Sequence, residues 1–355
     1  MFKVKKEIFN CMPAFFGGLA LFILFLVSCV TTGTAAKPEW VDAPESVYPA
    51  SIYISAVGES TKREWAEQNA LSNLSRFFKT SISVTQDVSD RYLTLLNDSN
   101  TTNSQETEVL ESILITSKQD SLIGAKITQT WTDEEGRCYA VAVMEKQKTA
   151  QIYSELVNKH TLEINKLLEK SKNADSILTA YSDLSLAYVL AAVNDDLLSV
   201  ISVVDVNLWK KIYPEYGTAQ AVKKLASEEA SKITVNLIYD ASVDDRIVSA
   251  FADVFTGMNF KVQKNGGGDY NFTIDYKVEQ IVLADNPNKF CRYTVNGTFA
   301  DAKTGKILSS FSENGREGHV SYTEAYQRVL RVSEEKILDD FAVKFNKFID
   351  TFAGI

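Results

Sequence analysis

Hydrophobic and polar positions along the chain follow two different periods. Apolar residues alternate with polar ones over residues 52–56, 123–143 and 233–301, and they recur every three or four positions over residues 146–204 and beyond residue 321. Alternation is typical of half-buried strands, whereas spacings of three and four are typical of amphipathic helices. The pattern therefore predicts two regions that contain strands, separated by a helical middle.

The first strand-containing region begins with a strand and a helix. Alternation over residues 52–56 predicts a strand that ends at Gly58. Thr61 and Glu64 have the spacing of a capping box, in which a hydroxyl and a carboxylate satisfy free amides at a helix start. Helical spacing then joins Trp65, Ala66, Asn69, Ala70, Asn73, Leu74, Phe77 and Phe78. The alanines of this helix would let it lie close to a sheet.

The same region continues into a predicted hairpin. Residues 82–88 suggest a second strand that includes Val88, and the polar segment Asn97–Glu108 suggests an exposed loop because it cannot form a core. Alternation over residues 123–143, broken at Asp133–Gly136, predicts two antiparallel strands joined by a tight turn.

The middle of the chain is predicted to be helical. Two apolar stripes over residues 146–204, separated by a break at Asn173–Asp175, predict two antiparallel helices joined by a short turn. A third helical stretch covers residues 218–232. His160 lies among charged neighbours in the first helix, and we expect it to be a surface residue rather than a ligand or a base.

The last region is predicted to be a second combination of strands and helices. Alternation over residues 233–237 predicts a strand, and Ser242 with Asp245 predicts the cap of the helix that follows. Ser321 and Glu324 form a further capping box at the start of a long amphipathic helix. The β-α-β-β-β-α order predicts an α+β sandwich with helices on one face of a sheet.

The amino terminus has the pattern of a secretory signal peptide. Three lysines precede a nearly continuous apolar run from Phe15 to Val27, which is shorter than the roughly 20 residues that a spanning helix needs. No later stretch is predicted to span a membrane, because Asn194, Asp195 and Asp196 interrupt the apolar runs of the helical middle.

The end of this signal peptide resembles the lipobox of bacterial lipoproteins in the order Leu26-Val27-Ser28-Cys29. The resemblance implies cleavage between Ser28 and Cys29 and acylation of Cys29, which would anchor the protein to the lipid bilayer. The alternative is a signal anchor with an incidental cysteine. Val30, rather than aspartate, follows the cysteine, which in enteric-type sorting resembles an outer-membrane address.

Residues 30–50 carry three of the six prolines and many small residues, which predicts a flexible stalk. Trp40 within the stalk and Tyr53 just after it are candidate partner-binding residues. Packing of Trp40 beneath the first domain is the commoner outcome for a tryptophan in such a place.

The predicted architecture is α+β, with two small α/β sandwich modules, helices on one face of each sheet, and a helical segment between them. Its boundaries are a lipoprotein signal peptide at 1–28, a lipidated stalk at 29–50, an amino-terminal α+β domain at 51–148, a helical segment at 149–231 and a carboxy-terminal α+β domain at 232–355.

Composition narrows the possible partners. Without residues 1–28 the chain keeps 34 basic and 45 acidic side chains, and an acidic surface argues against nucleic acid, whose binding rests on neutralised phosphates. It also argues against adhesion of the whole protein to anionic lipid. Cys138 and Cys291 remain after Cys29. They could form a disulfide in an oxidising envelope, but two free thiols are the favoured expectation.

The sequence contains no recognisable catalytic or metal-binding pattern. A nucleophilic hydrolase needs a serine or cysteine beside a base, and the chain has only two histidines and no G-x-S-x-G. The Gly266–Gly268 run is not followed by the lysine and helix start of a phosphate loop. We therefore expect no enzyme activity, no metal and no cofactor.

Several short elements resemble the bacterial Lpp-twenty lipoprotein family. They are "PEWV", "AVGES", the helix with Ala66 and Ala70, and "TWTDEEGRCYAVAVME", within about residues 37–150. Ser60, and Asn73 with Leu74, depart from the usual small residues of the family, and the polar segment near residues 97–108 is an additional departure. A related domain opens a flagellar assembly protein. The resemblance implies an envelope or flagellum-associated lipoprotein and no catalytic residues.

Residues 232–350 carry a second resemblance, through "GDYNFTIDYKVEQI" and "FADAKTGKILSS". They look like the periplasmic α/β domain shared by curli-secretion-type lipoproteins and the lipoprotein activator of penicillin-binding proteins. This resemblance implies a protein-binding platform, and function does not follow from fold alone.

Three functions remain open for a lipid-anchored protein of the bacterial cell envelope, expected at the outer membrane. The favoured one is a non-catalytic scaffold or adaptor for envelope or flagellar proteins of unknown identity. An activator of a peptidoglycan synthase is the first alternative, but a stalk of about 20 residues spans only roughly 25 Å, which is short for crossing a periplasm. A carrier of an apolar ligand is the other alternative, and it would require a large apolar pocket.

Overall fold

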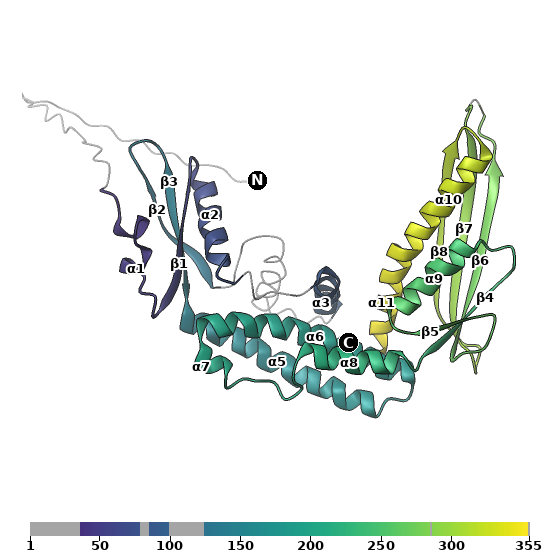
Figure 1. Cartoon of the computed structure of the whole chain (residues 1–355), viewed down its shortest axis with the longest axis horizontal. Helices are drawn as coiled ribbons and strands as arrows, with labels where there is room; N and C mark the ends of the chain where they lie inside the picture. Colours follow the sequence, from purple (N-terminus) through teal and green to yellow (C-terminus); the bar gives the residue numbers. More distant parts are fainter. Residues whose placement is uncertain (1–35, 79–84, 99–123, 285, 354–355) are drawn as a thin grey trace, which may run out of the picture. The chain divides into compact units, whose positions relative to one another are not determined.

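The computed structural model describes residues 36–78, 85–98, 124–284 and 286–353. It contains a three-stranded sheet, a five-stranded sheet and helices that pack on both, so the predicted α+β class is confirmed (Figure 1). Residues Lys37–Ile355 form one compact unit.

The first sheet is antiparallel with the strand order β1-β3-β2. Its strands are β1 (Tyr53–Ser60), β2 (Ala125–Thr132) and β3 (Cys138–Glu145), and β2 and β3 form the predicted hairpin. One face of β3 packs against the helix α2 (Arg63–Ser75) through small and apolar side chains. The other face is covered by η1 (Glu39–Val41) and the short helix α1 (Pro44–Val47). Both faces of this sheet are therefore covered, where the sequence analysis predicted helices on one face.

The predicted strand end at Gly58 and the predicted cap at Thr61 are both wrong. Strand β1 continues through Gly58 to Ser60, because the missing side chain of Gly58 lets α2 lie directly on the strand. Helix α2 begins after Lys62, and no side chain caps it. Amide groups of α2 instead fasten it to β1, since Asn73 Nδ2 donates to Val57 O at 2.8 Å.

Helix α3 (Gln86–Asp98) replaces part of the predicted second strand. Val88 lies within this helix and is buried, so its prediction as a strand residue is wrong. Residues 82–84 and residues 99–108 lie outside the described residues.

The helical middle is confirmed as two long helices, α5 (Lys146–Lys172) and α6 (Ile177–Val204), which lie side by side in Figure 1. The predicted break at Asn173–Asp175 is where they join. The short helix α7 (Val206–Trp209) and helix α8 (Ala219–Ala230) follow, and α8 packs on α6.

Helix α6 joins the two hydrophobic cores of the protein. Leu178 and Tyr181 near its start belong to the core of the second sheet, and residues from Leu186 to Val204 belong to the core of the first sheet. Among the described residues, α6 alone is long and apolar enough to cross a membrane by length and composition. Asn194, Asp195 and Asp196 do not interrupt it, because Asn194 and Asp196 are buried inside the helical layer.

The second sheet has five strands in the order β5-β4-β6-β7-β8, one strand more than the predicted order. The strands are β4 (Thr234–Tyr239), β5 (Lys261–Lys264), β6 (Tyr270–Ile281), β7 (Lys289–Asp301) and β8 (Ile307–His319). Strand β4 is parallel to β5 and β6, whereas β6, β7 and β8 form an antiparallel meander. Residues Gly266–Gly268 lie in the turn between β5 and β6.

Helices cover one face of the second sheet, namely α9 (Asp245–Gly257), α10 (Tyr322–Lys336) and α11 (Ala342–Asp350). The predicted cap at Ser321 is confirmed, because its hydroxyl accepts from the Glu324 amide. The predicted cap at Ser242 is wrong, since Asp244 caps α9. A π-helical turn, η2 (Ile337–Phe341), joins α10 to α11, and η3 (Thr351–Ala353) follows α11.

Candidate functional site

A groove of about 490 Å³ lies where α3, α6, α8, α9 and the η2–α11 segment meet. We call it the central groove. Its walls mix apolar side chains such as Val88, Val254 and Met258 with hydroxyl, amide and charged groups, and it is open to solvent. Segments from widely separated parts of the chain build it, so only the folded protein contains this site.

Helix α3 is held against this groove by Arg91. The Arg91 guanidinium donates to both carboxylate oxygens of Asp350 on α11, at 2.5 Å from Nη2 and 3.4 Å from Nε, and to Ser185 Oγ on α6 at 3.2 Å. Both charged side chains are largely shielded from solvent. A bidentate ion pair in such a place is stronger than an ion pair on the surface. Arg91 thereby positions one wall of the groove on two helices.

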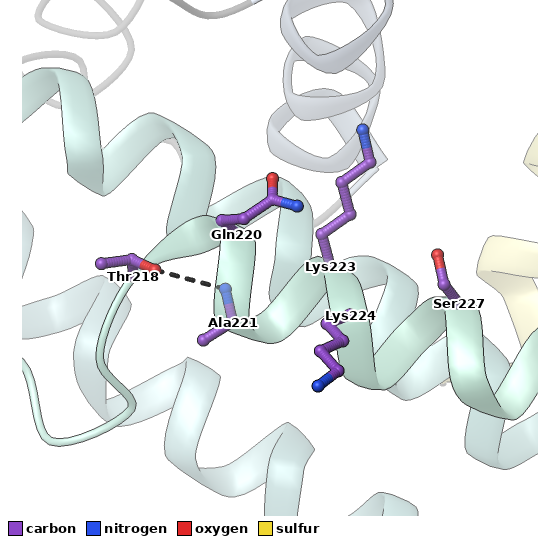
Figure 2. Close-up of a pocket in the computed structure, with 6 residues that line it drawn as sticks. All are labelled: Thr218, Gln220, Ala221, Lys223, Lys224 and Ser227. Carbon is purple, nitrogen blue, oxygen red and sulfur yellow. Dashed lines mark hydrogen bonds between the residues drawn. The ribbon is translucent and has the colours of Figure 1, made fainter.

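Two unpaired charges of opposite sign face the central groove. The Lys223 ammonium on α8 lies 5.4 Å from the centre of the Tyr188 ring, and Asp253 extends from α9. Neither charge has an ion-pair partner among the described residues. Figure 2 shows Lys223 and its neighbour Lys224 leaving α8 in different directions, and Lys224 pairs with Glu228 instead. The groove is therefore bipolar, with a cation and an anion from different helices available to a bound molecule.

The hydroxyl groups of the groove remain protonated at neutral pH. Burial is the main cause that raises the pKa of Tyr181, which lies on the α6 wall. Its hydroxyl can therefore act as a neutral hydrogen-bond donor or acceptor, alongside Ser185 and Ser227. Apolar contacts, neutral hydrogen-bonding groups and one charge of each sign suit a polypeptide segment, which carries the same three kinds of group.

A buried polar network lies between α3, α5 and α6. His160 is buried rather than a surface residue, which corrects the prediction made from its charged neighbours. Its Nδ1 lies 2.8 Å from Asn194 Oδ1, and its Nε2 lies 2.8 Å from the Tyr92 hydroxyl. Because Asn194 Nδ2 donates to Val157 O, its Oδ1 accepts from His160 Nδ1–H. The His160 ring thus links three helices.

We expect His160→Ala to lower the free energy of unfolding by roughly 2–3 kcal/mol, because it opens a cavity and leaves Asn194 Oδ1 without its donor. Urea unfolding followed by circular dichroism measures this change. Leu162→Ala, at an exposed position on the same helix, is the matched control and should change the unfolding free energy by less than about 0.5 kcal/mol. Equal effects of the two variants would contradict the role assigned to the network.

A buried carboxylate lies on the other side of α6. Asp183 is fully buried, and the Lys170 ammonium lies 3.2 Å from its Oδ1 without hydrogen-bond geometry, while the same ammonium donates to Ala353 O at 2.5 Å. Burial raises the pKa of Asp183, and Lys170 offsets only part of that rise. The ionised form of Asp183 is therefore less favourable in the folded protein than in the unfolded chain.

Because the folded pKa of Asp183 is raised, its contribution to stability is present in acid and is lost as the pH rises through that pKa. Asp183→Asn is expected to raise the free energy of unfolding at pH 7 by about 1 kcal/mol, since it keeps an acceptor for Lys170 and removes the buried charge. The gain should shrink towards pH 3.5. Thermal unfolding at both pH values measures it, with exposed Glu163→Gln as control. A loss of stability at pH 7 would show that the charge pair is needed.

The residues predicted from the sequence do not meet in this groove. Ser28 and Cys29 lie outside the described residues, so their predicted roles in cleavage and acylation stay predictions. Trp40 is only 2% exposed and packs on Val141 and Val143 of β3, which matches the packing alternative and leaves no exposed ring for a partner. Tyr53 is half-buried against Tyr48. The groove residues have no short sequence signature, because their spacing is set by tertiary packing.

Among the described residues, the histidine and cysteine side chains that are common in catalysis lie in different elements of the fold. His160 lies in the helical layer and His319 at the end of β8, whereas Cys138 and Cys291 are free thiols on different sheets. Burial raises the pKa of Cys291, which disfavours its reactive thiolate. No cluster of three potential metal ligands occurs in the part of the chain that the structure describes.

Comparison with known proteins relates the first domain to a lipoprotein family. Residues 38–145 match the family model described as LPP20 lipoprotein, the family that the sequence elements resemble. No curated protein matches the chain.

Three solved structures illustrate the structural similarity. A minor lipoprotein from Acinetobacter baumannii has 14% identity and a TM-score of 0.25, covering 34% of this chain and 94% of that one. A secreted protein from Helicobacter pylori has 11% identity and a TM-score of 0.38, covering 81% and 98%. The rare lipoprotein B of Shewanella oneidensis has 13% identity and a TM-score of 0.24, covering 34% and 94%. These scores are too low to carry a functional argument. The amino-terminal domain of this chain, over residues 38–145, is thus similar to the LPP20 lipoprotein family.

Proposed function

We propose that this protein is a non-catalytic scaffold of the bacterial envelope, anchored to a bilayer through acylated Cys29, that binds a segment of another envelope protein in the central groove. The lipobox and the LPP20 match over residues 38–145 support the anchored lipoprotein. The bipolar lining of the central groove supports a protein ligand.

The observation that carries the proposal is the pair of opposite charges, Lys223 on α8 and Asp253 on α9, that line the groove without an ion-pair partner among the described residues. Lys223 and Asp253 could each form a salt bridge with a bound chain, and Val88, Val254 and Met258 could pack against its apolar side chains. An enclosed apolar cavity would favour the carrier alternative instead. The central groove is open and about as polar as it is apolar, so it gives that alternative less support.

The length of the tether favours a scaffold over an activator that crosses the periplasm. Ordered structure begins before the predicted domain start at residue 51, since Trp40 already packs on β3. Lys37 is eight residues after Cys29, and eight residues extend at most about 28 Å. A fully extended stalk of about 20 residues would reach about 70 Å, so the shorter segment gives the synthase activator less support than the predicted stalk did.

Site-specific crosslinking in living cells tests the proposal. A photo-reactive phenylalanine derivative would replace Ser227 in the groove or Lys166 on the exposed face of α5, in the full chain. We expect a discrete crosslinked envelope protein from position 227 and none from position 166. Lys223→Glu should abolish the crosslink, whereas Lys224→Glu, next to it on α8 but directed elsewhere, should preserve it (Figure 2).

Three other outcomes would change the proposal. Equal crosslinking from both positions, or equal sensitivity to both lysine substitutions, would overturn the groove as the binding site. A peptidoglycan synthase as the crosslinked protein would favour the activator. Unchanged membrane retention of Cys29→Ala, measured by fractionation, would overturn the lipid anchor.

A further inference from the structure

Exposed apolar side chains gather at one end of the α5–α6 pair. Four of them lie close together in the sequence, at the end of α6, in α7 and just beyond: Val203, Val206, Trp209 and Tyr213. We call these four residues the α7 ridge. Trp209 is 40% exposed and Tyr213 is 69% exposed, which is high for aromatic side chains of this size.

The apolar residues of the α7 segment fall into a packed set and an exposed set. Leu208, Ile212 and Tyr216, four residues apart, pack on the core of the first sheet. The α7 ridge packs on none of the hydrophobic cores that the described residues form. The packed set fastens the segment to the domain, so the exposed ridge is left for something outside the chain.

The composition around the ridge fits a membrane interface. Tryptophan and tyrosine place an apolar ring among lipid chains and a polar edge at the headgroups. Lys210 and Lys211 are exposed between the two aromatic residues, and no ion pair holds either of them among the described residues. Asp205, the one acid between residues 203 and 213, caps α7 through two backbone amides. The ridge is therefore locally basic on an acidic protein.

The tether attaches at the same end of the molecule as the ridge. Lys170 lies beside Asp183 and His160 lies beside Asn194, so α5 and α6 run antiparallel. The start of α5 at Lys146 is therefore at the same end of the helix pair as the end of α6, where α7 begins. Lys146 starts α5 directly after β3 and donates its backbone amide to Ile52 O.

Trp40 lies three residues after Lys37 and packs on Val143 of β3. Val143 lies three residues before Lys146, which is about 10 Å along a strand. Ile52, an exposed apolar residue, belongs to this same end. Since Lys37 can lie no more than about 28 Å from Cys29, an anchor in the bilayer keeps this end of the protein close to the lipid surface.

We infer that the α7 ridge docks on the phospholipid bilayer, with Trp209 and Tyr213 at headgroup level and Lys210 and Lys211 against lipid phosphates. This inference rests on the proposed anchor at Cys29 for proximity. Docking adds a second membrane contact to the acyl chains, and it orients the protein by a defined face. A lipid anchor without such a contact would leave the protein free to rotate about its tether.

Tryptophan quenching in proteoliposomes tests the docking. The full lipidated chain would be reconstituted in vesicles of phosphatidylethanolamine and phosphatidylglycerol (3:1), with or without phospholipids brominated near the headgroup. Trp209→Phe removes the reporter on the ridge. Trp65→Phe is the matched control, because Trp65 is an exposed tryptophan on α2 outside the ridge. We expect brominated lipid to quench the wild type and Trp65→Phe equally, with the quenching lost in Trp209→Phe.

The lysines give a second, independent readout. Lys210→Glu with Lys211→Glu should reduce the quenching without changing the circular dichroism spectrum, since both side chains are exposed. Lys166→Glu with Lys172→Glu, two exposed lysines of α5, is the matched charge change and should leave the quenching unaltered.

The outcomes separate docking from anchoring. Quenching that persists in Trp209→Phe, or wild-type protein that stays with the vesicles but is not quenched, would overturn the docking while leaving the anchor intact. Failure of Cys29→Ala to reduce vesicle association would overturn the anchor, and quenching at Trp209 in that variant would still support the ridge. In native membranes, a protein bound over the ridge would shield Trp209 from brominated lipid, and removing that protein with high salt would restore the quenching. This result would assign the ridge to a protein partner and overturn the lipid assignment.

Discussion

Gly58→Val is expected to prevent the first domain from reaching its native packing. A Cβ atom at residue 58 would lie 2.1 Å from Ala70 N and 2.4 Å from Ala66 O, and both are backbone atoms that cannot rotate away. Helix α2 would have to leave β1, which would also break the bond from Asn73 to Val57 O. The expected loss is roughly 3 kcal/mol of unfolding free energy or more, at the upper end for overpacked cores.

Circular dichroism and urea unfolding measure the effect of Gly58→Val, and the fluorescence of buried Trp40 on the other face of the same sheet reports on the domain directly. Gly267→Ala is the matched control, because nothing lies within 4 Å of the position of its Cβ. We expect this control to unfold like the wild type. A stable Gly58→Val protein with an unchanged Trp40 signal would show that α2 does not lie as close to β1 as the structure places it.

Phe341→Ala is expected to have the largest effect in the second domain. The Phe341 ring lies between 5.0 and 5.8 Å, centre to centre, from the rings of Phe251, Phe255, Phe272, Phe311 and Phe345. It joins α9, the sheet and α11 in one aromatic cluster. Removing a fully buried phenylalanine costs about 3–5 kcal/mol, because lost burial is added to the cost of the cavity.

Urea unfolding of Phe341→Ala, compared with Val343→Ala, tests this cluster. Val343 lies two residues further on and is 69% exposed, so its truncation should change the unfolding free energy by less than about 0.5 kcal/mol. If the two substitutions cost the same, the π-helical turn does not direct Phe341 into the core. Loss of membrane retention in Phe341→Ala would report unfolding and not the loss of the anchor.

Local patterns identified the elements whose side chains interact mainly with near neighbours. The hairpin β2–β3 was visible as alternation on both sides of Asp133–Gly136, and the pair α5–α6 was visible as two apolar stripes around a polar break. The cap at Ser321 was also visible, because a cap depends on residues within one turn. These features need no information from distant parts of the chain.

Local patterns failed where distant residues decide the outcome. Gly58 was predicted to end a strand, but a helix above it stabilises the strand beyond it. Val88 alternates like a strand residue, yet it lies in α3, which Arg91 holds to Asp350 at the far end of the chain. His160 has charged neighbours in sequence, but its own side chain faces α6 and α3.

The candidate sites divide in the same way. Cys29 is a prediction that the sequence alone supports, because a cleavage and acylation signal is read as a short linear segment. The central groove and the α7 ridge could not be predicted, since their residues come from elements joined by packing or differ in exposure within one segment. Leu208 and Trp209 are adjacent apolar residues, and only the position of the core decides that Leu208 is packed whereas Trp209 is exposed.

The sequence by itself determined the α+β class, the helical middle, the LPP20-like first domain and the predicted lipid anchor. The tertiary structure decided how α6 joins two cores, which charged side chains line the central groove, and which apolar residues stay exposed. The physical reason is the distance along the chain over which each kind of interaction acts. Periodicity, capping and cleavage signals act over a few residues, whereas burial and pairing depend on which surfaces remain once the whole chain has packed.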